Sequence, residues 1–192
     1  MWLNHAKISV VWYNMLTTQS KHSFFMLARI HRKVRMKMKF EMLCNNKVYV
    51  EDVALEVFNE FVLKTASTKS YKECVDFFSH TYEKNFPMTF IATKNEKLVG
   101  SVSLFENDWA EKKEATPWIA SLVVEPEYRN QKIAEKLLTM AIAHLEKIGY
   151  EAVFLKTENA PNYYIKRGYQ LIEVTQNSDG QTVYIFSKKC HG

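Results

Sequence analysis

The stretch of the chain best suited to chemistry is a junction between an apolar run and an amphipathic run. Residues 118–124 are apolar and predict a buried strand, which Pro126 ends because proline cannot donate a hydrogen bond to a sheet ladder. An amphipathic pattern with helical spacing begins just after Arg129. The junction therefore directs free backbone N–H groups and the positive end of a helix dipole toward one point. Such a point is suited to anions, especially phosphate.

Two common phosphate-binding motifs and a cysteine metal site are not found in the sequence. The patterns Gly-x-x-x-x-Gly-Lys-Ser/Thr and Gly-x-Gly-x-x-Gly do not occur, which argues against P-loop and Rossmann sites. Cys44, Cys74 and Cys190 are odd in number and scattered, with no histidine at ligand spacing. They indicate reduced thiols in a reducing compartment, so we predict a cytoplasmic protein without a metal site.

The elements that position the junction form a predicted strand–helix–strand unit. The helical pattern continues to Ile148, and residues 152–156 form a short, mostly apolar strand. The unit over residues 118–156 has the length of a right-handed βαβ crossover, which makes its two strands parallel. Upstream, residues 88–93 and 98–105 flank a polar turn and predict a β-hairpin.

The remaining elements complete an α/β protein with a mixed sheet. They are an opening strand within residues 40–50, helices from Glu51 and from Ser70, a short helix over 160–166, and strands over 169–175 and 182–187. The predicted inner face of the helix from Glu51 is Ala54, Leu55, Phe58, Phe61 and Val62. Ser70 and Glu73 match a capping box, and Gly100 lets another backbone approach its strand.

Charge is distributed unevenly along the 192 residues, whose formal net charge is +5. Residues 1–40 hold eight of the 26 basic residues and no acid, which leaves 18 basic against 21 acidic residues and a net charge of −3 in the remainder. We therefore predict no nucleic-acid binding by the main domain. No apolar run approaches the roughly 20 residues that a membrane-spanning helix needs, so no transmembrane segment is predicted.

Residues 1–39 are predicted to be a basic N-terminal extension to a single domain over residues 40–192. We expect this extension to be loosely packed and poorly ordered, as chain termini often are. Its composition also fits an organelle transit peptide, a basic helix on a membrane surface, or an arm that binds nucleic acid.

Two segments resemble signatures of the GNAT superfamily of N-acetyltransferases. Val124–Ala134 resembles the family's pyrophosphate loop, which reads Arg/Gln-x-x-Gly-x-Gly/Ala after a strand ending in Val-x-Pro. Ala160–Tyr169 is similar to its second signature, Tyr-x-Lys-x-Gly-aromatic. The resemblance covers roughly residues 40–190. It implies a GNAT-like fold, with a central mixed sheet of six to seven strands flanked by helices.

The resemblance implies acetyl-CoA as co-substrate and no metal. Backbone N–H groups from Asn130 to Ala134 are placed to cradle the pyrophosphate, and the peptide-like pantetheine arm can pair with Leu122–Val124 as an added strand. By resemblance, this strand splays from residues 152–156, and the thioester lies in the gap. The predicted cofactor-binding residues are Leu122, Val123, Val124, Arg129, Asn130, Gln131, Lys132, Ile133, Ala134, Asn159 and Tyr164.

Three residues are predicted to be catalytic. Tyr164 matches the family's tyrosine near the thioester sulfur, where its phenol would protonate the departing thiolate; the alternative is an aromatic ring that packs beneath the cofactor. The amine must lose a proton, and Glu106 and Asp108, just after the strand over 98–105, are the candidate general bases. The alternative for both acids is an ordinary place in a solvated loop.

Lys132 departs from the family pattern, since the motif has glycine there. We expect helix-start torsions at this position, which suit any L-residue, and therefore tolerated but weaker binding of the cofactor. Lysine also offers an ammonium group that can lie along the phosphates.

The predicted function is transfer of the acetyl group of acetyl-CoA to a primary amine of a small-molecule acceptor, by direct attack in a ternary complex. The alternative is a non-catalytic or weakly active module that keeps the fold and senses CoA. The acceptor is not encoded in a recognisable motif, and the resemblance leaves a homodimer open.

Overall fold

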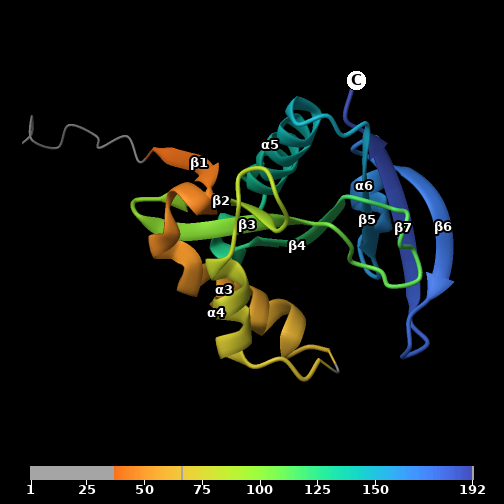
Figure 1. Ribbon diagram of the computed structural model, residues 1–192, viewed down its shortest axis with the longest axis horizontal. Helices are drawn as coiled ribbons and strands as arrows, with labels where there is room; N and C mark the ends of the chain where they lie inside the picture. Colours follow the sequence, from red (N-terminus) through yellow and green to blue (C-terminus); the bar gives the residue numbers. More distant parts are fainter. Residues whose placement is uncertain (1–36, 66, 192) are drawn as a thin grey trace, which may run out of the picture. The chain divides into compact units, whose positions relative to one another are not determined.

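A mixed sheet runs through the part of the chain that the computed structural model describes, residues 37–65 and 67–191 (Figure 1). Within these residues the sheet has seven strands in the order β1-β2-β3-β4-β5-β7-β6. They are β1 (Met38–Met42), β2 (Met88–Lys94), β3 (Lys97–Phe105), β4 (Trp118–Val124), β5 (Ala152–Thr157), β6 (Gln170–Gln176) and β7 (Thr182–Lys189). The predicted fold class is confirmed. The predicted extension over residues 1–39 lies outside the described residues except for its last three.

Helices cover both faces of this sheet. They are α3 (Val50–Val57), α4 (Tyr71–Ser79), α5 (Ile133–Lys147) and α6 (Pro161–Ile165), with 3₁₀ turns η1 (Leu43–Asn45), η2 (Lys47–Tyr49) and η4 (Pro126–Tyr128) and a π-helical turn η3 (Phe58–Val62). Successive side chains of β2 point to opposite faces of the sheet: Phe90 packs with α5, while Ile91 packs with α3 and α4. Each face is therefore covered by its own layer of helices. None of the described helices is long and apolar enough to cross a membrane.

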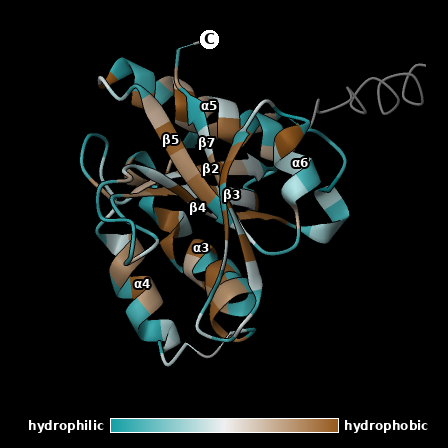
Figure 2. Ribbon diagram, turned by 90° about the vertical axis from the view of Figure 1, so that its right-hand side faces the viewer, coloured by the Kyte–Doolittle hydropathy of each residue, from teal (hydrophilic) through white to brown (hydrophobic). Residues whose placement is uncertain are grey.

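The two layers lie on opposite sides of the sheet in Figure 1, with α5 on one side and α3 and α4 on the other. Figure 2 shows hydrophobic residues along the central strands and hydrophilic residues on loops and on much of α4. The capping box at the start of α4 is confirmed: the N–H of Glu73 donates to Ser70 Oγ at 3.3 Å, and the N–H of Ser70 donates to Glu73 Oε2 at 2.7 Å.

The predicted inner face of α3 was partly wrong. Its buried residues are Val50, Val53, Ala54 and Val57, whereas Leu55 is 48% exposed and Phe61 is 38% exposed. The buried stripe at 50, 53, 54 and 57 leaves Leu55 outside it. The exposure of Phe61 follows from the π-helical turn after α3, in which the N–H of Leu63 donates to the Phe58 carbonyl five residues earlier. This wider turn moves the helical phase by about one residue, so that Val62 returns to the core.

The end of β4 separates from β5. The two strands are parallel, as predicted, but they pair only at Trp118–Phe154 and Ile119–Leu155. A bulge follows in the pairing of β4 with β3, and Ser121 has a positive φ of 52° there. Residues 122–124 therefore have no strand partner on the β5 side among the described residues, which leaves an open backbone edge.

Gly100 of β3 fixes how closely the end of β4 approaches. A Cβ atom at this position would lie 2.8 Å from the carbonyl oxygen of Val123, closer than real contacts allow. Gly100→Ala should therefore push β4 away and lower the free energy of unfolding by about 1–3 kcal/mol. Urea denaturation measures this loss; a variant as stable as the parent would mean that β4 moves freely at Val123.

Candidate functional site

A cavity of about 690 Å³ opens beside the unpaired end of β4; we call it the α5-side cavity. Its walls are the end of β4, the junction of η4 with α5, and α6. Nine predicted cofactor-binding residues line it: Leu122, Val123, Val124, Arg129, Asn130, Lys132, Ile133, Ala134 and Tyr164. Glu60, Tyr128, Glu135, Ala160, Tyr163 and Arg167 complete the lining. The sequence-predicted residues thus largely gather around one space.

Two predicted residues lie outside this lining. Gln131 borders a neighbouring hollow with Lys132 and Lys136, and its side-chain amide donates to the Glu127 carbonyl at 3.4 Å. Asn159 is exposed in the turn after β5.

The backbone at the start of α5 is shaped for an anion. Asn130 and Lys132 both have positive φ, of 62° and 60°, and Lys132 is the N-cap of α5 in the left-handed conformation. The N–H groups of the first helical turn have no partners within the helix and face outward with the positive end of the dipole. Concave groups of N–H donors of this kind bind phosphate.

The expectation that Lys132 has helix-start torsions was wrong. Its φ of 60° and ψ of 18° lie in the left-handed region that glycine occupies without steric cost. The glycine of the resembling motif would adopt this left-handed torsion without steric cost and would also leave room for a phosphate. Lysine adopts the same torsion at a cost in conformational free energy.

Tyr164 is buried at the inner wall of the α5-side cavity, with 9% of its surface exposed. Its ring packs edge-on against Tyr163 at 5.1 Å and Tyr169 at 5.4 Å between centroids. Burial, with a smaller effect from Tyr163, raises the pKa of Tyr164 to about 12. Its hydroxyl is therefore protonated at neutral pH and able to donate.

Arg129 and Arg167 bring positive charge to the same cavity. Arg129 Nε donates to the Val124 carbonyl at 3.0 Å, which ties the loop to the end of β4. Arg167 stacks on Tyr163, with 3.6 Å between its guanidinium carbon and the ring centroid. Its buried Nε has no hydrogen-bond partner among the described residues. Both guanidinium groups line a space suited to an anionic ligand.

Glu106 and Asp108 are placed differently. Glu106 is exposed just after β3, whereas Asp108 is half-buried and contacts Lys156, with 3.4 Å between Nζ and Oδ2. Burial raises the pKa of Asp108, against the opposing effect of Lys156. Neither acid belongs to the lining of the α5-side cavity as the described residues define it. The structure therefore does not bring them to Tyr164.

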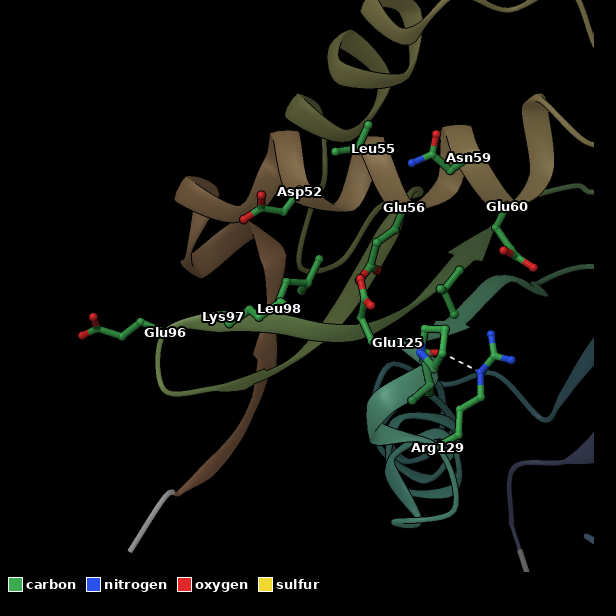
Figure 3. A pocket seen from close by; sticks show the side chains of 13 residues that line it. Asp52, Leu55, Glu56, Asn59, Glu60, Glu96, Lys97, Leu98, Glu125 and Arg129 are labelled. Carbon is green, nitrogen blue, oxygen red and sulfur yellow. Dashed lines mark hydrogen bonds between the residues drawn. The ribbon is translucent and has the colours of Figure 1, made fainter. Parts of the chain in front are cut away.

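A second cavity, of about 400 Å³, lies beside α3 and the same end of β4 (Figure 3); we call it the α3-side cavity. The two cavities share Glu60, Val123, Val124 and Arg129. Five acids line the α3-side cavity against two basic residues: Asp52, Glu56, Glu60, Glu96 and Glu125, with Lys97 and Arg129. This cavity was not predicted from the sequence. The available signal was the spacing of Asp52, Glu56 and Glu60, four residues apart on one helical face.

Glu56 is a partly buried acid of the α3-side cavity. Figure 3 shows its carboxylate pointing toward that of Glu125. Its Oε2 accepts a hydrogen bond from Ser101 Oγ at 3.3 Å, while its buried Oε1 has no partner among the described residues. Burial first, and then the negative charge of Glu125, raises the pKa of Glu56 to about 7. Over residues 37–65 and 67–191, no group of three or more His, Cys, Asp or Glu side chains is arranged to hold a metal ion.

Several solved structures share this fold. An aminoglycoside 6′-acetyltransferase of type Ii is 17% identical, with a TM-score of 0.63 over 82% of this chain and 99% of its own. YncA of Salmonella typhimurium, solved with acetyl-CoA, is 14% identical, with a TM-score of 0.63 over 80% and 94%. The ribosomal-protein-S18-alanine N-acetyltransferase of Escherichia coli is 18% identical, with a TM-score of 0.57 over 80% and 94%.

A comparison with curated proteins finds no match. The sequence model of the acetyltransferase (GNAT) family, however, matches residues 52–170, which is more than half of the chain. This range runs from α3 through the α5 junction and beyond α6, and it includes every described residue that lines the two cavities. The chain therefore belongs to the acetyltransferase (GNAT) family.

Proposed function

We propose that this protein transfers the acetyl group of acetyl-CoA to a primary amine of a small-molecule acceptor. The observation that carries the proposal is the single cavity that joins an open strand edge, an anion-shaped helix start and a buried phenol. Its volume of about 690 Å³ is within the range of cofactor and ligand sites. Family membership and similar structures solved with acetyl-CoA or CoA support the choice of co-substrate.

Each wall of the α5-side cavity has a role in this proposal. The N–H groups from Asn130 to Ala134 hold the pyrophosphate, assisted by the cationic side chain of Arg129. The free backbone edge of residues 122–124 pairs with the peptide-like arm of the cofactor. When bound, acetyl-CoA supplies the thioester whose acetyl group is transferred.

Tyr164 is the proposed general acid. Its raised pKa keeps the hydroxyl proton in place until a strongly basic thiolate develops beside it. Direct attack by the amine needs both substrates at once, and this matches two cavities that meet at the same strand end. The similar structures include enzymes named for aminoglycosides and for a ribosomal protein, so the fold is compatible with different acceptors.

Tyr164→Phe removes the proposed proton donor while keeping the buried ring. We expect kcat to fall about 10²-fold or more, with the affinity for acetyl-CoA nearly unchanged. Turnover can be followed by thiol release across a panel of amines, and affinity by calorimetry. Tyr169→Phe is the matched control, since it removes a neighbouring buried hydroxyl that is not part of the cavity lining.

Two outcomes would contradict the proposal. If millimolar acetyl-CoA gives no binding heat with the parent chain, the cofactor assignment is wrong. If acetyl-CoA binds but no amine is acetylated and Tyr164→Phe changes nothing, the chain is a non-catalytic CoA-binding module.

Lys132 has two separable properties, a left-handed backbone and a positive charge. Lys132→Gly should raise the free energy of unfolding by roughly 0.5–1 kcal/mol, since glycine adopts this torsion without steric cost but loses more chain entropy. It should also weaken acetyl-CoA binding several-fold, because an ammonium group beside the phosphates is lost. Lys132→Met is the control: it should lose the same affinity without the gain in stability. Unchanged affinity in both variants would show that the ammonium group does not face the phosphates.

A further inference from the structure

The α3-side cavity meets the α5-side cavity at the end of β4. Val123 and Val124 line both spaces, and in the β3–β4 pairing Val123 is opposite Ser101. Ser101 donates to the Glu56 carboxylate at 3.3 Å, so this carboxylate lies close to the strand that forms the shared wall. Because α3 and α5 cover opposite faces of the sheet, a group lying along the open edge of β4 can be approached from both sides.

We propose that the α3-side cavity receives the acceptor amine and that Glu56 takes the proton which the amine must lose before it attacks. This inference rests on the proposed acetyl transfer, and it adds the base and the acceptor class. The base is a single residue of α3 that stands beside the shared wall.

Glu56 has the properties that a base at this place needs. One carboxylate oxygen accepts a hydrogen bond from Ser101, while the other is buried and has no protein partner among the described residues, so the carboxylate keeps an acceptor position that no protein donor occupies. The charged groups around it come from three segments: Asp52 of α3 and Glu60 of η3 flank it, Glu96 of the β2–β3 turn and Lys97 at the start of β3 lie next along the lining, and Glu125 and Arg129 follow β4. Asp108, by contrast, is already paired with Lys156.

The same surroundings indicate the class of acceptor. Five carboxylates and two basic side chains line the cavity, so a ligand with one cationic group leaves most of the acidic charge uncompensated. The structure therefore favours a small, flexible amine with a second cationic group. The π-helical turn η3 contributes to this selection, because it places Asn59 and Glu60 in the same lining.

The proton and electron balance is complete with these residues. The acceptor arrives as an ammonium ion and gives one proton to Glu56, which frees the nitrogen lone pair. A C–N bond to the acetyl carbon then forms, the C–S bond breaks, and its electron pair leaves with sulfur. Tyr164 gives its proton to that sulfur and regains one from the acylated nitrogen, while Glu56 releases its proton to solvent. The products are an amide, CoA thiol and one proton.

Glu56→Gln in the full chain tests the base, with putrescine and n-butylamine as a pair of acceptors of equal carbon number. In the parent we expect kcat/KM to be about 10-fold or more higher for the diamine. Glu56→Gln should lower kcat about 10²-fold or more for both amines. In the parent, kcat/KM should rise with pH to a plateau with an apparent pKa of about 7, and in Glu56→Gln this rise should be absent.

Folding of the variant is checked independently. The pKa of Glu56 is raised in the folded state, so its ionisation costs stability as the pH rises toward and through about 7. Glu56→Gln should therefore melt at a higher temperature than the parent, with a larger gain at about pH 8 than at about pH 5. Glu151→Gln, at an exposed position after α5, is the control and should change neither turnover nor this difference.

A binding measurement separates this inference from the proposed function. Calorimetry of putrescine with the chain saturated by CoA, which has no acetyl group to transfer, should give binding that Glu56→Gln weakens about 10-fold. Such binding without turnover of acetyl-CoA by the parent would contradict the proposed function and the role of Glu56 as base, and would leave the α3-side cavity as a diamine-binding site only. Full turnover by Glu56→Gln, or activity lost only in Glu106→Gln or Asp108→Asn, would overturn the assignment of the base.

Discussion

The pairing of β4 with β5 is the constraint on which the site depends. The two parallel strands pair at only two positions, and the bulge around Ser121 leaves the rest of β4 paired with β3 alone. The end of β4 stays in the sheet because residues 123–124 remain paired with β3, and because Gly100 allows the backbone of β4 to approach β3 closely. The open edge is thus a stable property of the fold, held by the layers on both sides.

The charges on the two sides of this edge have opposite sign. On the side of α5, the helix start and the guanidinium groups of Arg129 and Arg167 favour an anion. On the side of α3, five carboxylates favour a cation. Among the described residues, Arg129 is the one basic residue that belongs to both linings, and its Nε is already bonded to the Val124 carbonyl. The strand therefore separates two ligand environments that would otherwise neutralise each other.

Local sequence signals predicted much of this arrangement. The capping box of Ser70 and Glu73, the parallel crossover and the gathering of residues 129–134 at the start of α5 follow from residues close together in the chain. The left-handed torsion of Lys132 was missed because the sequence pattern around it is that of an ordinary helix start. The exposure of Phe61 was missed because a π-helical turn has no clear sequence signature. The α3-side cavity joins three separated segments, 52–60, 96–98 and 123–129, which only the tertiary fold brings together.

The wall that the two cavities share is only a short piece of one strand, Val123 and Val124. A ligand in one cavity and a ligand in the other therefore contact the same two residues from opposite sides. Any coupling free energy between two such ligands is reciprocal, since it acts equally on both. A strand end that lacks a neighbour on one side is thus also the one piece of strand that both cavities share among the described residues.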